Sequence, residues 1–305
     1  MKKNILSMAA LAMLMTGTMS ACSEKNPYPG YEKSPNGLYY RFHTQNEGEK
    51  PQLGDLLEAT FSCTVNDTTV IIPAQPNIFK LQESLFKGDI FEGMAMLHKG
   101  DSASFIVDID STFRTFFNQP SLPSEFAPTD VMRFEFKLKD FYPEEEYARR
   151  FAEDVRKSNG ERAERLKNEY VDETAKAATE LADYLAKNKI VAEPTESGLI
   201  YVVTEQGNGE KPQVGKPVKM HYTGKLLNGK VFDSSVERNE PFTFVLGVGQ
   251  VIPGWDEGVQ LMSKGEKGVF YIPYYLAYGE RDMGDIPPFS NLIFEVELVE
   301  TEVNE

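Results

Sequence analysis

Alternation of hydrophobic and polar positions predicts three strands in the last third of the chain. The segments that alternate are 217–227, 242–246 and 292–298. Each is expected to bury one face. One short helix is expected at about 254–262, because Trp255, Val259 and Met262 recur at helical spacing. A sheet with one apolar face must bury that face against the helix, so the pattern predicts an α+β fold with an antiparallel sheet.

The chain also repeats part of itself. The string GEKPQ occurs at 48–52 and again at 209–213, 161 positions later. Near the end of each copy, FEFKL at 134–138 corresponds to FEVEL at 294–298. A period this long indicates two duplicated globular domains rather than a solenoid. The expected domains are 34–143 and 194–305.

The segment between the copies, 144–190, predicts a helical linker. It is rich in Glu, Ala, Arg and Lys and contains no proline. Ser158-Asn159-Gly160 indicates a break, so we expect a short helix over 144–157 and a longer one over 161–187. A broken apolar stripe leaves three interpretations open: a solvated spacer, a helix packed on its own domains, or the surface of a homodimer.

The first 21 residues predict a secretory signal. Two lysines precede an apolar run from Ile5 to Met15, which is too short to span a membrane, and small residues lead to Cys22. This order is similar to a bacterial lipoprotein signal (1–21), in which cleavage leaves Cys22 lipidated and 22–33 as a tether. The protein would then be exported and membrane-anchored, at the outer membrane, a periplasmic face or the cell surface. The alternative is an ordinary secretory signal with Cys22 left as a thiol.

Composition removes several classes of function. The net charge of −15 argues against general affinity for nucleic acid. With two cysteines and three histidines, a disulfide scaffold or a metal site with several such ligands is nearly excluded. Cys63 lies in a strand-like run, LEATFSCTV, and is expected to be buried rather than reactive.

Six motifs in the second copy carry a resemblance to a known family. They are HYTGKLLNGKVFDSS (221–235), PFTFVLG (241–247), VIPGWDEGV (251–259), LAYGE (276–280), IPP (286–288) and LIFEVEL (292–298). Together they look like the FKBP-type peptidyl-prolyl cis-trans isomerases, over about 195–302. The resemblance implies two FKBP-like domains, each a twisted antiparallel sheet wrapped around a short helix. It implies isomerisation of X–Pro bonds in proline-containing client polypeptides, without a cofactor or metal.

The resemblance also implies an aromatic pocket for the proline ring. Its aromatic walls would be formed by Tyr222, Phe232, Phe242, Trp255 and Phe294. Trp255, the only tryptophan, would be the floor. Tyr278 would donate its hydroxyl to a carbonyl at or near the twisting bond.

Five further residues have implied roles around this pocket. Val251 and Ile252 would line one side, with the Ile252 backbone N–H holding a substrate carbonyl. Asp233 would accept hydrogen bonds at the edge, close enough to Arg238 to pair with it. Ile286 would roof the cleft.

One departure from the family pattern concerns the loop before Ile-Pro-Pro. The family usually has glycine and an apolar residue there, whereas this chain has Gly284-Asp285. The loop also carries Glu280, Arg281 and Asp282. We expect an acidic rim that favours prolines flanked by Lys or Arg.

The first copy lacks the polar groups of the pocket. Aligned with the second, it has Ile90 in place of Trp255, Ile71-Ile72 in place of Phe232-Asp233, and Phe113 in place of Tyr278. We therefore expect 34–143 to be a degenerate domain without useful isomerase activity. Two functions stay open for the whole chain: a folding isomerase for exported proteins, or a membrane-tethered chaperone or scaffold that binds proline segments without turnover mattering.

Overall fold

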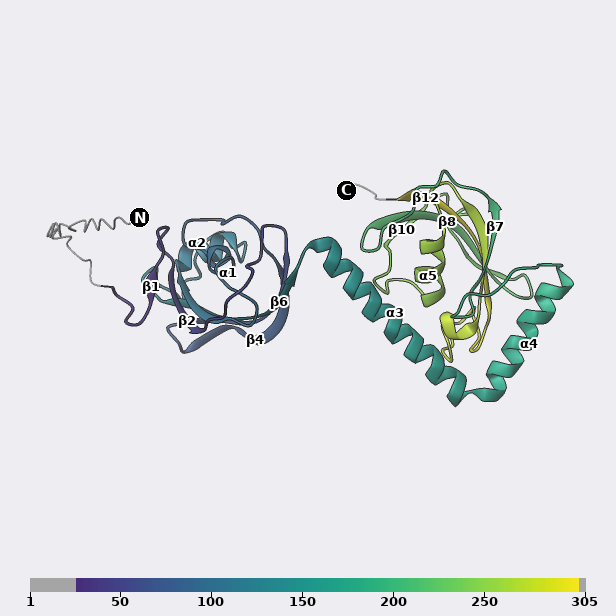
Figure 1. Ribbon diagram of the computed structural model, residues 1–305, viewed down its shortest axis with the longest axis horizontal. Coiled ribbons are helices and arrows are strands. Elements are labelled where there is room, and N and C mark those ends of the chain that lie inside the picture. The colour runs from purple at the N-terminus through teal and green to yellow at the C-terminus, as the bar shows by residue number, and fades with distance from the viewer. Residues whose placement is uncertain (1–25, 302–305) are drawn as a thin grey trace, which may run out of the picture. The chain divides into compact units, whose positions relative to one another are not determined.

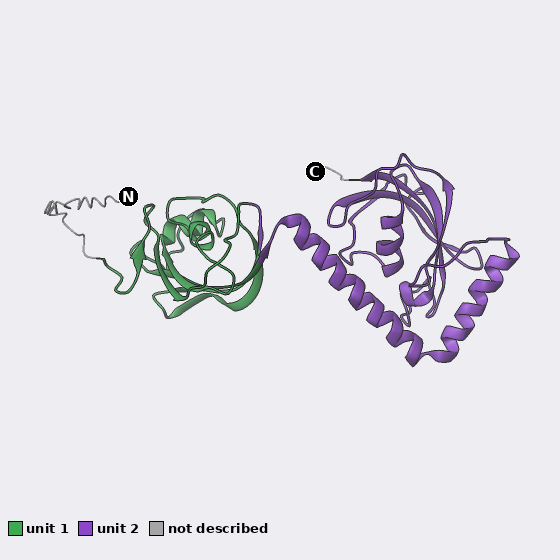
Figure 2. Ribbon diagram, in the orientation of Figure 1, with its two compact units in different colours: residues 1–53, 57–140 green, residues 54–56, 141–305 purple. Residues whose placement is uncertain are grey.

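The computed structural model describes residues 26–301. The predicted signal (1–21) and Cys22 lie outside this range. Within it, the chain forms two compact units, one of residues up to 53 with 57–140 and one of 54–56 with 141–305 (Figure 2).

The first unit is a six-stranded sheet with two short helices. Its strands are β1 (Glu32–Lys33), β2 (Tyr39–Thr44), β3 (Leu56–Val65), β4 (Thr69–Lys80), β5 (Ser102–Val107) and β6 (Met132–Tyr142). Its helices are α1 (Ile90–Met94) and α2 (Ile109–Thr115). The strand order is β1-β2-β5-β6-β3-β4. Cys63, on β3, is fully buried, and burial raises the pKa of its thiol to about 12.

The second unit begins with two long helices and continues into another sheet (Figure 1). The helices are α3 (Glu144–Glu169), α4 (Val171–Lys187) and the short α5 (Pro253–Leu261), with a 3₁₀ turn at Tyr274–Leu276. The strands are β7 (Ile200–Glu205), β8 (Pro217–Leu226), β9 (Val231–Ser234), β10 (Phe242–Val245), β11 (Lys267–Ile272) and β12 (Leu292–Thr301). They run in the order β10-β8-β12-β11-β7, with β9 also on β8, and every pair is antiparallel.

The two sheets share one topology. In each sheet, the first strand of the repeat (β2 or β7) pairs with a late strand (β5 or β11). That late strand also pairs with the last strand of the repeat (β6 or β12). The long second strand, β3 or β8, then follows in both orders. A short helix, α1 or α5, precedes the same late strand in both. The shared order confirms the predicted α+β class and two domains of one fold.

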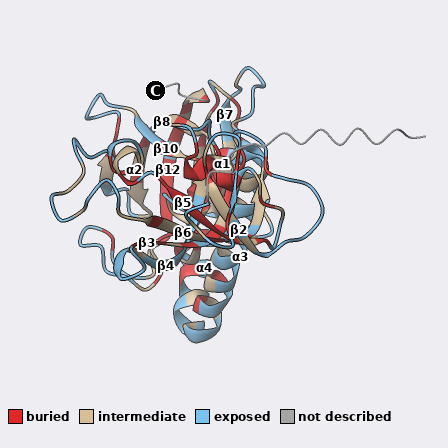
Figure 3. Cartoon of the chain, turned by 90° about the vertical axis from the view of Figure 1, so that its left-hand side faces the viewer, coloured by how far each residue is buried: buried red, intermediate tan, exposed pale blue. Residues whose placement is uncertain are grey.

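The predicted strands and helix of the second unit are confirmed. On β8, Val218, Met220 and Tyr222 are buried at alternate positions. They face α5, which begins with Pro253, a residue suited to the first helical turn because it lacks an N–H. Among the described residues, many buried positions lie in the strands and in the short helices, whereas α4 is largely exposed (Figure 3).

The predicted break at Ser158-Asn159-Gly160 is wrong. Helix α3 runs through it to Glu169, and the chain turns instead at Tyr170, whose backbone is not helical. Glycine inside a helix costs about 1 kcal/mol, and packing of α3 on its own unit outweighs that cost. An added Cβ at Gly215 would come within 2.4 Å of the Ala148 side chain, which shows how closely helix and loop approach.

The apolar stripe of the linker packs within the second unit. Leu166 lies in a buried cluster with Ala177 and Tyr274. Leu181, on α4, packs with Tyr271 and its neighbours on the sheet face opposite α5. This is the second of the three interpretations, a helix packed on its own domain. The homodimer prediction thereby loses the surface on which it rested.

Across residues 26–301, no helix is both long enough and apolar enough to cross a bilayer.

Candidate functional site

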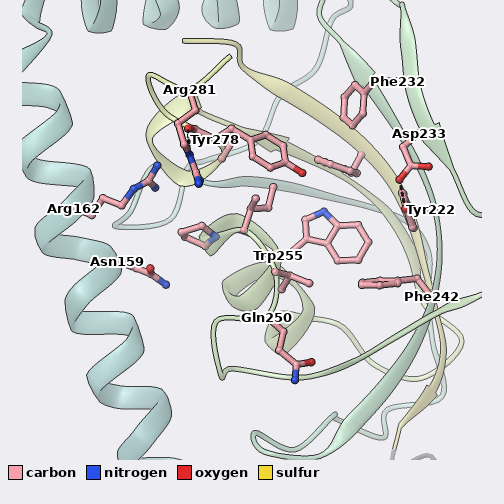
Figure 4. Close-up of a pocket in the computed structure, with 15 residues that line it drawn as sticks. Asn159, Arg162, Tyr222, Phe232, Asp233, Phe242, Gln250, Trp255, Tyr278 and Arg281 are labelled. Atoms are coloured by element: carbon pink, nitrogen blue, oxygen red, sulfur yellow. Dashed lines mark hydrogen bonds between the residues drawn. The ribbon is translucent and has the colours of Figure 1, made fainter. Parts of the chain in front are cut away.

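The second unit contains a cavity of about 580 Å³ beside the start of α5 (Figure 4). Strands β8, β9, β10 and β12, helices α3 and α5, and the segment after the 3₁₀ turn all contribute to it. The lining residues are Asn159, Arg162, Tyr222, Phe232, Asp233, Phe242, Gln250, Val251, Ile252, Pro253, Trp255, Ala277, Tyr278, Arg281 and Phe294.

Aromatic rings packed edge to face build the floor. Trp255 is 4% exposed and is the third residue of α5. Its ring centroid lies 5.1 Å from that of Tyr222 and 5.3 Å from that of Phe294, at interplanar angles of 89° and 83°. Such pairs favour a fixed ring orientation. The floor is therefore a rigid apolar surface.

The loop ahead of α5 is fixed by a buried carboxylate. Asp256 accepts hydrogen bonds from the backbone N–H groups of Gly247 (2.9 Å) and Gly249 (2.8 Å). Both glycines have positive φ, at 80° and 74°, a conformation that a Cβ makes costly. This loop leads into Val251 and Ile252, so the same contacts position one side of the cavity. The Ile252 backbone N–H has no acceptor within the described part of the chain.

A hydrogen-bonded trio forms the polar edge. Tyr222 donates its hydroxyl to Asp233, Arg238 donates to the other carboxylate oxygen, and Arg238 Nη2 lies 3.2 Å from the Tyr222 hydroxyl. Burial alone would raise the pKa of Asp233, but the hydrogen bonds from Tyr222 and Arg238 outweigh it and lower that pKa. Burial, followed by the bond to Asp233, raises the pKa of Tyr222. At neutral pH the edge is an ionised, paired carboxylate.

Tyr278 points into the space over Trp255 (Figure 4). Burial raises the pKa of its hydroxyl, with a smaller contribution from the Asp233 charge and partial compensation by Arg281. Among residues 26–301 this hydroxyl has no hydrogen-bond partner. It is therefore a protonated donor available to a ligand.

The structure brings together nine of the eleven predicted pocket residues. They are Tyr222, Phe232, Asp233, Phe242, Val251, Ile252, Trp255, Tyr278 and Phe294. Arg238 holds the edge from outside the lining, through its bonds to Asp233 and Tyr222. Ile286 is not among the lining residues, and its role as a roof stays a prediction. Its apolar side chain is 7% exposed and packs in the core, while its backbone oxygen accepts from Met283 N–H.

The sequence did not indicate the α3 side of the cavity. Asn159 and Arg162 line it from α3, at the place where a break was predicted. No periodicity marks them, because the contact depends on how α3 docks. The cavity lining does not support the predicted acidic rim. Asp285 pairs with Lys230 at 2.6 Å, and neither Glu280 nor Asp282 lines the cavity, whereas Arg281 does.

The first unit has apolar residues at the aligned positions. Ile90 starts α1 and is buried, and Phe113 stacks on Phe126 with ring centroids 5.6 Å apart. Ile71 and Ile72 lie on β4. These side chains contain no hydroxyl or carboxylate, so this surface cannot reproduce the polar edge of the second unit.

Fold and site together define an α+β domain whose apolar pocket suits a ring-sized ligand with carbonyl acceptors. Residues 208–299 match the model of the FKBP-type peptidyl-prolyl cis-trans isomerase family. A peptidyl-prolyl cis-trans isomerase of Schizosaccharomyces pombe is 54% identical over 99 residues, which cover 32% of this chain and 88% of that protein. The chain therefore belongs to the FKBP-type peptidyl-prolyl cis-trans isomerase family.

Longer relatives match over part of their length. The FKBP-type isomerase FkpA of Aeromonas hydrophila is 53% identical over 122 residues, or 39% of this chain and 45% of that one. The crystal structure of FkpA from Escherichia coli is 38% identical with a TM-score of 0.39, covering 45% of this chain and 62% of that one. The chain spans between 45% and 60% of the length of the first curated relatives it matches.

Proposed function

We propose that the second unit accelerates cis/trans isomerisation of X–Pro bonds in exported polypeptides. The observation that carries this is the set of groups in one cavity: an aromatic floor at Trp255, an unpartnered hydroxyl on Tyr278 and a polar edge at Asp233. The proline ring would lie on Trp255. Its neighbouring carbonyls would accept from Tyr278 and from the Ile252 N–H.

The chemistry needs no nucleophile. Amide resonance gives the planar bond a barrier of about 18–20 kcal/mol, and X–Pro bonds isomerise in tens to hundreds of seconds. A catalyst has to bind the twisted amide better than the planar one. The twisted amide has lost charge separation. Its transfer from water to an apolar site therefore costs less free energy than the transfer of the planar form. A donor such as Tyr278 adds to this if its bond is strongest in the twisted geometry.

We propose that the chain is tethered to a membrane. The support is the order of basic, apolar and small residues before Cys22, with cleavage leaving a lipidated N-terminus and 22–33 as the tether. The site would then face clients on the exported side. Residues 1–25 lie outside the described range, whereas Tyr31 is buried and Glu32–Lys33 form β1, so the folded first unit begins before the end of the predicted tether.

For 34–143 we propose a role without useful catalysis. Its aligned positions hold Ile90 and Phe113, which cannot donate or accept side-chain hydrogen bonds. Three roles remain for it. It could bind clients, bind a partner protein, or act as a spacer between the second unit and the membrane.

A binding function without turnover is the alternative, and the two can be separated with one variant. In the full chain, Tyr278→Phe with Asp233→Ala removes the donor and the edge but keeps the aromatic floor. Refolding of a protein limited by proline isomerisation should then slow to nearly its uncatalysed rate. If that variant accelerates refolding as well as the unmodified chain does, the isomerase proposal fails. Suppression of aggregation that survives while acceleration is lost would assign binding to other surfaces.

A further inference from the structure

We propose that α3 forms part of the substrate site, and that Arg162 and Arg281 select polypeptides with an acidic residue next to the proline. The proposal rests on the proposed isomerase function and names its substrate class. It assigns recognition to a helix that lies before the FKBP-type domain in sequence.

Contacts along α3 hold it at the cavity. Small or apolar side chains of the helix meet glycines of three loops. The approaches are Ala148 to Gly215, Ala152 to Gly247, Val155 to Gly249, and Leu166 to Gly279. Leu166 is fully buried, and Ala163 is 5% exposed within the core cluster that includes Trp255. Since Arg162 lies next to Ala163, its backbone is held by this packing.

Two guanidinium groups meet at this side of the cavity (Figure 4). Arg162 Nη1 donates to the backbone oxygen of Tyr275 at 3.4 Å, and Arg281 Nε donates to that of Tyr278 at 3.2 Å. Burial lowers the pKa of Arg162, and the neighbouring Arg281 charge lowers it further. Guanidinium groups nonetheless stay protonated in proteins. Each guanidinium group therefore keeps further N–H donors besides the one that is bonded to a backbone carbonyl.

These two charges have no direct counterion. Within residues 26–301, neither arginine has a carboxylate within 4.0 Å. The charge of the nearby Glu280 raises the pKa of Arg162 from beyond this distance. Glu280 itself lies closer to Arg165, at 3.9 Å. On the opposite edge, Asp233 is already paired with Arg238. The cavity therefore has one neutralised edge and one positive side.

A peptide carboxylate is the ligand that fits this positive side. Arginine presents several donors in a planar fork that matches carboxylate geometry. The net charge of −15 on the whole chain does not remove this preference, because charges beyond about 8–10 Å are largely screened at physiological salt. An Asp or Glu beside the proline would reach the arginines while the ring lies on Trp255.

The test compares short peptides that differ only in one residue beside the proline. Glu, Gln or Lys is placed either before or after it, and cis/trans exchange is measured with the full chain. We expect kcat/KM for a Glu peptide to exceed that for its Gln counterpart by about two- to fivefold at one of the two positions, and Lys to be poorest. Added salt should shrink the difference.

Variants assign the effect to the arginines. Arg162→Gln with Arg281→Gln should bring the Glu-to-Gln ratio close to one. Arg156→Gln is the matched control, since Arg156 is exposed on the same helix and does not line the cavity. It should leave the ratio unchanged.

The outcomes separate the two proposals. Equal acceleration of all peptides, or a ratio that survives the double variant, overturns the charge selection and leaves the isomerase function standing. No acceleration of any peptide overturns the isomerase function itself. The salt dependence of the unmodified chain supplies a readout if the double variant fails to fold.

Discussion

The Tyr278 hydroxyl is half-buried in the cavity without a partner among the described residues. Polar groups in such a position are usually satisfied by protein, water or ligand. Because Tyr278 lies opposite the edge formed by Asp233, a substrate amide over Trp255 would have donors on one side and a fixed charge pair on the other. This asymmetry makes single-residue substitutions informative.

Tyr278→Phe should lower kcat/KM for X–Pro exchange about two- to twelvefold, the range expected for one net hydrogen bond of about 0.5–1.5 kcal/mol. The ring is kept, so binding to the floor should change little. The control is Tyr184→Phe, the same change on α4, outside the cavity lining. Equal losses in the two variants would argue against a role for the Tyr278 hydroxyl.

The rate should be independent of pH between about pH 5 and about pH 9. The pKa of Asp233 is lowered below its usual value near 4, and those of Tyr222 and Tyr278 are raised above their usual value near 10. Neither class of group titrates between these limits. A step in the rate near pH 6 to 8, measured with one peptide, would show that another group controls catalysis.

The same shift in Asp233 predicts the sign of an effect on stability. Its folded-state pKa lies below its unfolded one, so its pairing stabilises the fold above about pH 4. That contribution is lost as pH falls through the lowered pKa. Because Asp233 is partly exposed, the effect should be small. Urea unfolding of Asp233→Asn against the unmodified chain should show a difference at pH 7 that shrinks at low pH.

At the scale of elements, local patterns predicted the strands well and the helical linker poorly. Alternation at Val218, Met220 and Tyr222 predicts β8 because one face of the strand is buried. Gly160 signalled a break, but packing of α3 overrides that local preference. The turn at Tyr170 has no glycine or proline to announce it. For the same reason Arg162 was missed: helix docking leaves no periodic signal in the sequence.

Leu166→Ala should loosen α3 and destabilise the second unit by about 2–5 kcal/mol, the usual cost of a cavity at a fully buried leucine. Equilibrium unfolding in urea, followed by Trp255 fluorescence, measures it. Val171→Ala is the control, since Val171 is 63% exposed. If both variants unfold like the parent chain, α3 is not part of the stable unit.

At the scale of the whole molecule, the chain combines two domains of one topology with unequal chemistry. The shared strand order was predictable from the repeat of GEKPQ and the later matches. The loss of polar groups in 34–143 was predictable too, because the residue type alone decides whether a side chain has a hydroxyl or a carboxylate. The positive side of the cavity was not, since it joins Arg162 to Arg281, residues far apart along the chain.

The predicted lipid anchor at Cys22 determines where the whole chain is located. In a bacterial host that processes lipoprotein signals, the full chain should fractionate with membranes and gain label from a fatty-acid precursor. Cys22→Ser should abolish the label and move the protein to the soluble exported fraction. Cys63→Ser is the matched control and should change neither property. Membrane association that persists in Cys22→Ser without label would contradict the anchor.

The most direct test of the account is X–Pro cis/trans exchange on a short peptide, measured with the full chain and with Trp255→Ala. We expect clear acceleration by the parent chain and almost none by a folded Trp255→Ala variant, because the first unit has Ile90 at the aligned position. Acceleration that survives this variant would place the activity outside the described pocket. No acceleration by the folded parent chain would mean that the cavity binds proline segments without turning them over.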